Sequence, residues 1–243
     1  MWTIAEFRPV ALFSLRPANA TVSGGKTLIT PTPFAIKMAL LDGAIRLWGR
    51  DQGAEWWPQI RDLAVAVALP DQLLVVKTFQ RILRPQGLRD RLGTGLSGPW
   101  GANIVYREYV QFDTSAPMQI AIRDVHPDTS ALPWIGLFSQ INYFGKRGSF
   151  FQFTDAYTGD GLDDTVFTLL NEPSDGFDPR GLMQLLDDCG SEMTFAHADI
   201  YDQTHPRLKI NQPDGRLLNI VVLPYAQTGA GRGFTAYQRL ERM

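Results

Sequence analysis

Four arginines lie within eleven residues of one another, and their side chains are suited to binding phosphate. They are Arg81, Arg84, Arg89 and Arg91, and Asp90 is the one acidic residue among them. A guanidinium group can donate two parallel hydrogen bonds to a phosphate, and an aromatic side chain such as Trp100 can stack on a base. The stretch therefore indicates a surface that binds RNA.

These arginines lie in a long connection between two segments that have the pattern of β-strands, residues 73–82 and 104–112. A simple hairpin needs two to five loop residues, so a loop over about 81–103 needs a functional reason. Trp100 stands among glycines and a proline in this loop. We expect it either to contact a base or a partner subunit, or to fold back onto its own domain.

Further basic residues lie in turns and beside strand ends; they are Arg16, Lys26, Lys146, Arg147 and Arg232. Lys26 follows glycines as in a phosphate-binding P-loop, but Ala20 stands where that motif needs its first glycine. The sequence therefore argues against nucleoside triphosphate binding and leaves Lys26 as a candidate contact to an RNA phosphate. Arg232 lies in a glycine-rich turn, which is either plain turn or a further RNA contact.

No group of residues has the spacing of a catalytic or metal site, and no cofactor is expected. The histidines His126, His197 and His205 are far apart, and Cys189 is the single cysteine. Metal sites need several such ligands at short spacing. The paired acids at 163–164 and 187–188 are predicted to be solvated, since neighbours on a strand point apart.

The charge is distributed unevenly along the 243 residues. Residues 155–192 carry a net charge of −9 and the remainder +7, which gives −2 overall. A basic remainder is compatible with one RNA-binding face. No apolar run is long enough to span a bilayer, and one cysteine agrees with a reducing compartment, so we expect a cytoplasmic protein without membrane contact.

The pattern of elements predicts an α+β fold. Thr32 and Pro33 begin a helix that Gly49 ends, with Lys37 beside its apolar stripe of residues 34, 38, 41, 45 and 48. Helices are also predicted within 132–144 and 182–189, and a hairpin joins 207–210 to 217–223. The order predicts a ferredoxin-like (RRM-like) domain with a long hairpin over 1–154. An acidic connecting segment and a smaller β-rich C-terminal part follow over 155–243.

Four segments, taken in order, resemble the CRISPR-associated RAMP subunit that caps the CRISPR RNA (crRNA) 5′ handle in type I Cascade complexes. The segments are FSLR (13–16) with TPTPFAIKMALL (30–41), residues 63–80, YREYV (106–110) and YFGKRGS (143–149). The family's helix has a glycine where this chain has Met38. The resemblance covers about residues 3–153.

The resemblance implies that the long hairpin is a thumb, which lies near the junction of handle and guide and touches the adjacent backbone subunit. The expected partners are crRNA, that subunit and the large subunit, with target DNA met only indirectly. The expected RNA-binding residues are Arg16, Lys26, Lys37, Arg81, Arg84, Arg89, Arg91, Trp100, Arg107, Lys146, Arg147 and Arg232.

Two alternatives to a non-catalytic RNA-binding subunit remain open. Some relatives cut precursor crRNA without a metal by acid–base chemistry, which would need a histidine beside the RNA. The other alternative is a scaffold subunit with little RNA contact that docks through its acidic segment.

Overall fold

The computed structural model describes residues 1–20, 25–85, 100–126, 131–173, 176–201, 204 and 207–241, with backbone alone at 82–85 and 100–103. The elements are, in chain order, β1 (Trp2–Pro9), α1 (Pro33–Trp48), α2 (Arg50–Asp62), β2 (Ala64–Ala68), β3 (Gln72–Pro85), β4 (Trp100–Phe112), β5 (Met118–Arg123), α3 (Trp134–Phe138), β6 (Phe151–Gly159), β7 (Thr168–Leu169), β8 (Leu182–Cys189), α4 (Phe195–Ala198), β9 (Arg216–Leu223), β10 (Tyr225–Ala230) and β11 (Phe234–Arg239).

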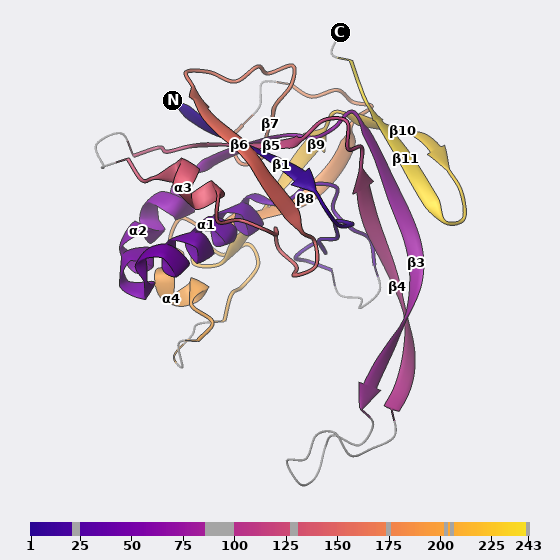
Figure 1. The fold of residues 1–243 in the computed structure, drawn as a ribbon, viewed down its shortest axis with the longest axis horizontal. Helices are drawn as coiled ribbons and strands as arrows, with labels where there is room; N and C mark the ends of the chain where they lie inside the picture. The colour runs from indigo at the N-terminus through magenta and orange to yellow at the C-terminus, as the bar shows by residue number, and fades with distance from the viewer. Residues whose placement is uncertain are drawn as a thin grey trace.

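The main sheet has the strand order β6-β1-β5-β2-β7, and its neighbouring strands are antiparallel (Figure 1). If β1, β2, β5 and β6 are taken as the first to fourth strands, the order is 4-1-3-2. Helices α1 and α2 connect the first strand to the second, and α3 lies between the third and the fourth. This is the ferredoxin-like arrangement, and it confirms the predicted α+β fold class.

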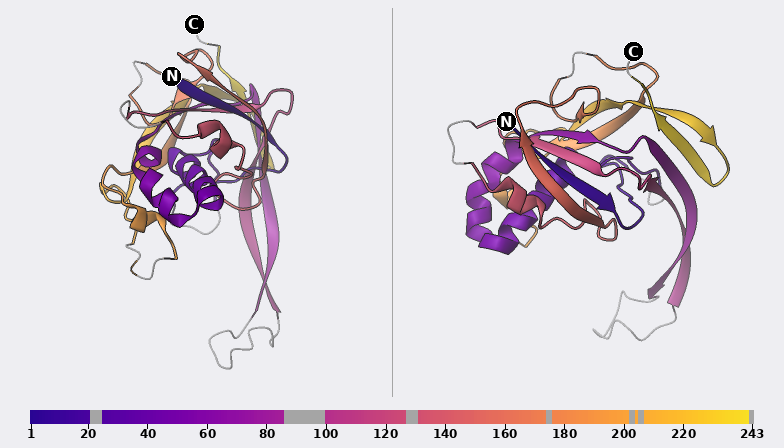
Figure 2. Two further views of the ribbon diagram at one scale, coloured as in Figure 1. Left: turned by 60° about the vertical axis from the view of Figure 1, so that its left-hand side comes forward. Right: turned by 45° about the horizontal axis from the view of Figure 1, so that its top comes forward.

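Both faces of the main sheet are covered. Helices α1 and α2 pack on one face (Figure 2), where Ile36, Leu40 and Ile60 join the core that includes Val65 and Val67 of β2. The alternate alanines of β2 face the other side and pack with Trp2 and Phe167. Since every residue of β2 is buried, this short strand can be apolar throughout.

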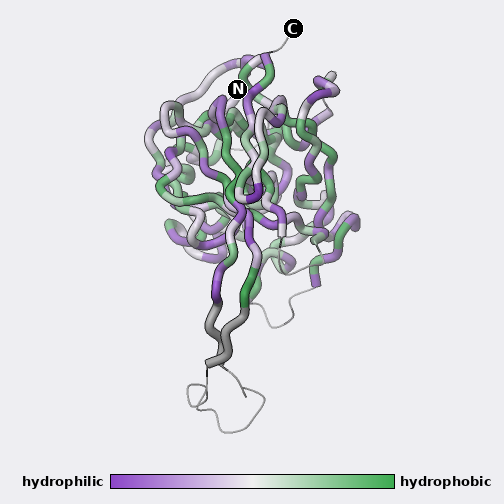
Figure 3. The backbone as a smooth tube through the Cα atoms, turned by 90° about the vertical axis from the view of Figure 1, so that its right-hand side faces the viewer, coloured by the Kyte–Doolittle hydropathy of each residue, from purple (hydrophilic) through white to green (hydrophobic). Residues whose placement is uncertain are grey.

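The hairpin of β3 and β4 enters the chain between the second and third ferredoxin strands. Its register runs from Leu73 opposite Phe112 to Pro85 opposite Trp100. Its base pairs with β11 in a second sheet of order β10-β11-β3-β4, and its outer part extends away from the body (Figure 3). The strands are longer than predicted, since β3 continues through Pro85 and β4 begins at Trp100.

Helix α1 has the predicted ends, although its buried face differs from the predicted stripe. The Thr32 hydroxyl accepts a hydrogen bond from the Ala35 amide, and Gly49 follows the last turn with a φ of 88°. Lys37 is buried, whereas Trp48 is 45% exposed. The next helix, α2, was not predicted and contains Pro58.

Several predictions for the C-terminal part were wrong. Residues 182–189 form the strand β8, not a helix, and β8 pairs along its whole length with β9. This pairing replaces the predicted hairpin, because residues 207–210 meet β9 only through a bridge between Ile210 and Arg216. In the N-terminal part, helix α3 covers only five residues of the predicted 132–144.

The C-terminal strands share the core of the N-terminal part. Leu186, Val221 and Tyr225 belong to the same apolar cluster as the residues of α1 and β2. The Tyr225 hydroxyl oxygen lies 2.9 Å from the carbonyl oxygens of both Leu69 and Pro70, which share its single proton as acceptors. The division of the chain at residue 154 stays a prediction. Within the described part of the chain, no helix is long and apolar enough to cross a membrane.

Candidate nucleic-acid interface

A cavity of about 470 Å³ opens between α1, the segment 141–146, β4 and the β8–β9 pair. Its apolar lining includes Leu15, Phe34, Ala35, Met38, Ala39 and Ile141, and its charged lining consists of Arg16, Arg46, Arg107, Lys146, Arg216, Asp42 and Asp187. Five cations thus face two acids around a partly apolar space. Of the predicted RNA-binding residues, Arg16, Arg107 and Lys146 are brought together here.

Arg107 and Lys146 reach the cavity from two different elements. Arg107 lies on β4, and its buried Nε has no hydrogen-bond partner among the described residues. Lys146 follows Phe144, whose ring packs against Phe7 at 5.0 Å and against Phe151 at 5.4 Å. Partial burial lowers the pKa of Lys146, and the charge of Arg107 lowers it further. An anion between these two cations would relieve their repulsion.

The turn that carries Lys146 depends on Gly145. This residue has a φ of 69°, and a Cβ placed there would lie 2.6 Å from Cδ1 of Leu15. A left-handed backbone and this close approach both favour glycine. Gly145 therefore allows the turn that brings Lys146 and Leu15 together in the lining of the cavity.

Glu108 holds the loop of Lys26 against β4. The Thr27 amide donates to Glu108 Oε2 at 3.2 Å, and the Glu108 amide donates to the Gly25 carbonyl at 3.4 Å. Gly25 pairs with Arg107 in a parallel bridge, so the exposed Lys26 lies next to the strand that carries Arg107. Arg16, also exposed, donates to the Ala20 carbonyl.

Arg46 and Arg216 line the cavity but were not predicted as site residues. Arg46 Nε lies 2.9 Å from Asp42 Oδ2, one helical turn earlier on α1. Arg216, the first residue of β9, lies 3.2 Å from Asp187 Oδ2. The position of Arg46 in the last turn of the predicted helix was a weak indication in the sequence that it could be a site residue. The sequence contained no such indication for Arg216, because its ion-pair partner and the strand that pairs with β9 are both distant from it in the sequence.

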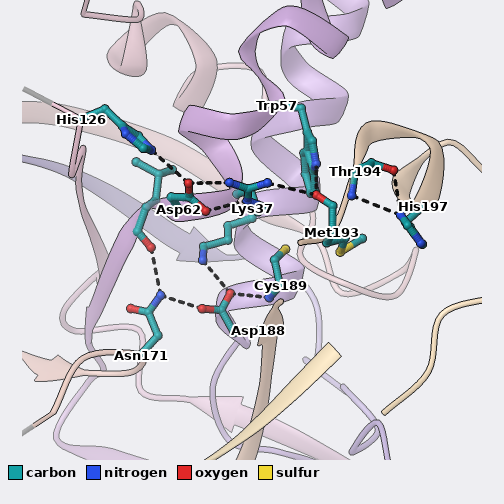
Figure 4. Close-up of polar contacts among 12 residues, drawn as sticks. Lys37, Trp57, Asp62, His126, Asn171, Asp188, Cys189, Met193, Thr194 and His197 are labelled. Atoms are coloured by element: carbon teal, nitrogen blue, oxygen red, sulfur yellow. Dashed lines mark hydrogen bonds and ion pairs between the residues drawn. The ribbon is translucent and has the colours of Figure 1, made fainter. Parts of the chain in front are cut away.

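Lys37 is an internal ion-pair residue, which corrects the expectation that it faces RNA. Its Nζ lies 2.7 Å from Asp188 Oδ1, and its side chain is 2% exposed (Figure 4). Asn171 donates to the other oxygen of Asp188 at 2.7 Å. The prediction that residues 187 and 188 are solvated was therefore also wrong, because both carboxylates are buried beside cations.

The other predicted RNA-binding residues lie outside the cavity. Arg81 is exposed on β3, and Arg232 is exposed in the turn between β10 and β11. Arg147 is exposed beside Lys146, and a hydrogen bond from its guanidinium to Tyr143 raises the pKa of Arg147. Arg84 and Trp100 are described by backbone alone, and Arg89 and Arg91 lie outside the described residues.

The described histidines have structural partners away from the cavity. His126 Nε2 lies 3.0 Å from Asp62 Oδ2, and His197 Nδ1 lies 2.8 Å from the Thr194 hydroxyl at the start of α4. His205 lies outside the described residues. In the part of the chain that the structure describes, no group of three or more histidine, cysteine or acidic residues could hold a metal ion.

Lys146 is expected to acetylate faster than Lys209 at neutral pH, although both residues are exposed. Its pKa is lowered by burial and by Arg107, so a larger fraction of its amine is neutral and nucleophilic. Mass spectrometry after brief treatment with an acetylating reagent measures both rates. Arg107→Ala should slow the reaction of Lys146 and leave Lys209 unchanged. Equal rates for the two lysines in the unmodified protein would contradict the lowered pKa.

No protein-family model matches the sequence, and no curated protein matches it. Fifteen chains of solved structures match it, among them the following two. The first is a CRISPR protein from Archaeoglobus fulgidus, at 14% identity and a TM-score of 0.48 over 98% of this chain and 91% of that chain. The second belongs to a CRISPR RNA-guided surveillance complex, at 11% identity and a TM-score of 0.41 over 98% and 90%.

Proposed function

We propose that this chain is a non-catalytic RNA-binding subunit of a cytoplasmic type I CRISPR Cascade complex and that it holds the 5′ handle of the guide RNA. The convergence of Arg16, Arg107 and Lys146 at one cavity carries the RNA-binding proposal. The ordered sequence motifs quoted above support the assignment to a CRISPR complex.

Among the described residues, no acidic side chain pairs with Arg16, Arg107 or Lys146. The two acids of the cavity pair with Arg46 and Arg216 instead. These three side chains are therefore available to phosphates, and the exposed Lys26 lies close by. Phosphate contacts fix the position of a strand and base contacts add specificity, so a basic cavity with apolar walls suits both tasks.

The hairpin supports contact with a neighbouring subunit. Phe79 is 76% exposed on β3 and Ile104 is 74% exposed on β4, and both lie beyond the part of the hairpin that pairs with β11. Phe79 also contacts the ring of Tyr106 at a centroid distance of 5.3 Å. Large apolar side chains that are exposed in this way suit a protein or RNA partner. In the proposed complex the backbone subunit occupies this position, with the large subunit elsewhere and target DNA met only indirectly.

No described histidine lines the cavity, and this favours binding over cleavage in our proposal. Metal-independent cleavage of RNA needs a general acid and base beside the scissile phosphate. His126 is occupied by Asp62 at the end of α2 and does not line the cavity. Incubation with repeat RNA in EDTA provides the direct measurement, and we expect the RNA to remain intact.

The triple variant Arg16→Ala, Arg107→Ala, Lys146→Ala tests RNA binding at the cavity. We expect weaker binding of repeat RNA and a log–log salt dependence that is less steep by about 2, since each lost single-strand phosphate contact removes about 0.7. Fluorescence anisotropy titrations at several salt concentrations measure both quantities with the full-length chain.

Arg207→Ala is the matched control, because Arg207 is exposed and does not line the cavity. It should leave the salt dependence almost unchanged. If the triple variant kept the affinity and the salt slope of the unmodified chain, the cavity would not be the RNA site.

A further inference from the structure

Arg216 is held in the cavity by contacts on two sides. Its Cζ lies 3.8 Å from the centroid of the Phe34 ring, and its NH1 lies 3.2 Å from Asp187 Oδ2. The Asp187 side chain is 8% exposed, whereas that of Arg216 is 31% exposed. An arginine placed over an aromatic ring and paired at its edge has little freedom to rotate.

The elements behind Arg216 are joined by a second contact. Asp187 and Asp188 are neighbours on β8, so their side chains point to opposite faces of the strand. Asp187 pairs with Arg216, and Asp188 pairs with Lys37 of α1, the same helix that supplies Phe34. The β8–β9 pair is thereby fixed against α1, and the position of Arg216 is set before any ligand binds.

The contacts of Arg216 leave part of its guanidinium group available to a ligand in the cavity. Phe34 lies against the guanidinium and Asp187 pairs with its NH1, while the Arg216 side chain stays 31% exposed and lines the cavity, so part of the guanidinium is accessible to a ligand there. A flat cation is a platform on which a nucleobase stacks. A cavity of about 470 Å³ with apolar walls has the size and character of a small-ligand site.

We propose that Arg216 is a base-stacking residue of the RNA site and that Asp187 is the positioning residue that holds it. This inference rests on the proposed function and adds to it a residue from the C-terminal part. The ligand group is one unpaired nucleobase, stacked on the guanidinium, while Arg16, Arg107 and Lys146 contact the adjoining phosphates.

The experiment compares two probes of about ten nucleotides, a length that single-strand-binding folds accommodate. One probe is single-stranded oligoadenylate with a single 2-aminopurine, and the other is an abasic ribose-phosphate chain of the same length. We expect Arg216→Lys to weaken binding of the base-containing probe by about fivefold or more, because lysine keeps the charge but offers no stacking face. Binding of the abasic probe should not change, and the quenching of 2-aminopurine should be lost.

The variant Asp187→Asn separates the positioning role of Asp187 from the effect of its negative charge on RNA binding. It makes the chain more positive by one unit, so a purely electrostatic role predicts tighter binding. We expect weaker binding of the base-containing probe instead, because Arg216 loses the partner that orients it. Asp160→Asn is the control, since Asp160 is exposed and lies outside the cavity, and it gives the effect of the charge alone.

Three results would overturn the inference: unchanged binding by Arg216→Lys, an equal loss on both probes, or tighter binding by Asp187→Asn. The triple cation variant keeps the two proposals distinguishable, because it should lose affinity for both probes. If it does so while Arg216→Lys binds normally, the stacking role alone fails. If the unmodified chain binds neither probe, both proposals fail. Thermal unfolding of each variant checks that the fold is kept.

Discussion

Lys37→Met is expected to lower the free energy of unfolding by about 3–5 kcal/mol, the typical cost of removing one partner from a buried ion pair. The substitution leaves the carboxyl group of Asp188 desolvated beneath α1, without the cation that now lies 2.7 Å from it. Asn171 and the Cys189 amide continue to donate hydrogen bonds to Asp188, but neither supplies a positive charge. Urea denaturation at neutral pH measures the change.

The loss of stability in Lys37→Met should depend on pH. Burial raises the pKa of Asp188, and Lys37 opposes that rise. Without the lysine, the folded-state pKa lies further above the unfolded one, so the folded protein binds the proton more tightly. The deficit relative to the unmodified protein should therefore shrink as the pH falls and grow as the pH rises through the folded-state pKa.

Two further variants test this explanation. Lys37→Met combined with Asp188→Asn removes both charges and should recover much of the lost stability. Arg180→Ala breaks the exposed ion pair with Asp178 and should change stability little. A deficit that is the same at every pH, or that persists in the double variant, would show that lost packing rather than an unpaired carboxylate is responsible.

Trp57→Ala is expected to lower the free energy of unfolding by about 3–5 kcal/mol, because it removes a large side chain from the core. Trp57 is 2% exposed and lies where α2 meets the C-terminal part. Its Nε1 donates to the Met193 carbonyl at 2.7 Å (Figure 4). Denaturation curves followed by circular dichroism provide the measurement, and the helices and β8 should unfold together.

The variant Trp57→Phe shows how much of the lost stability comes from burial of the ring and how much from the hydrogen bond to Met193. The phenylalanine keeps an aromatic ring in the core but has no N–H group. The Met193 carbonyl therefore loses the hydrogen bond from Trp57 Nε1, at a cost of about 1–3 kcal/mol. Trp48→Ala is the matched control, since Trp48 is 45% exposed and contacts Trp56 at a centroid distance of 5.0 Å. We expect a loss of about 1 kcal/mol for this exposed pair. If Trp48→Ala were as damaging as Trp57→Ala, burial would not be the cause.

Features set by local sequence could be predicted, whereas those set by distant contacts could not. Thr32, Pro33 and Gly49 define the ends of α1 because capping depends on adjacent residues. Residues 182–189 form a short segment of mixed apolar and polar residues that fits either a helix or a strand, and only the pairing with β9 decides between them. Helix α2 was missed because Pro58 argues against a helix interior.

The same distinction applies to the candidate site. Arg16, Arg107 and Lys146 lie in motifs that could be singled out locally, and the fold brings them to one cavity. Lys37 looked like a surface residue because it lies beside the apolar stripe of α1, but its partner is 151 positions away in the sequence. Arg216 joins the site only because β9 lies against β8, a pairing that the local pattern of either strand does not determine.

The point at which the hairpin enters the chain has a consequence for how this fold can vary. The strand order of the main sheet is complete without the outer part of β3 and β4 (Figure 1). Removing or adding two facing residues on each strand would change the span of the arm by about 6.8 Å while keeping the alternation of its faces. The length of the hairpin, and with it the distance to a neighbouring molecule, can therefore change in fixed increments without repacking the core of the main sheet.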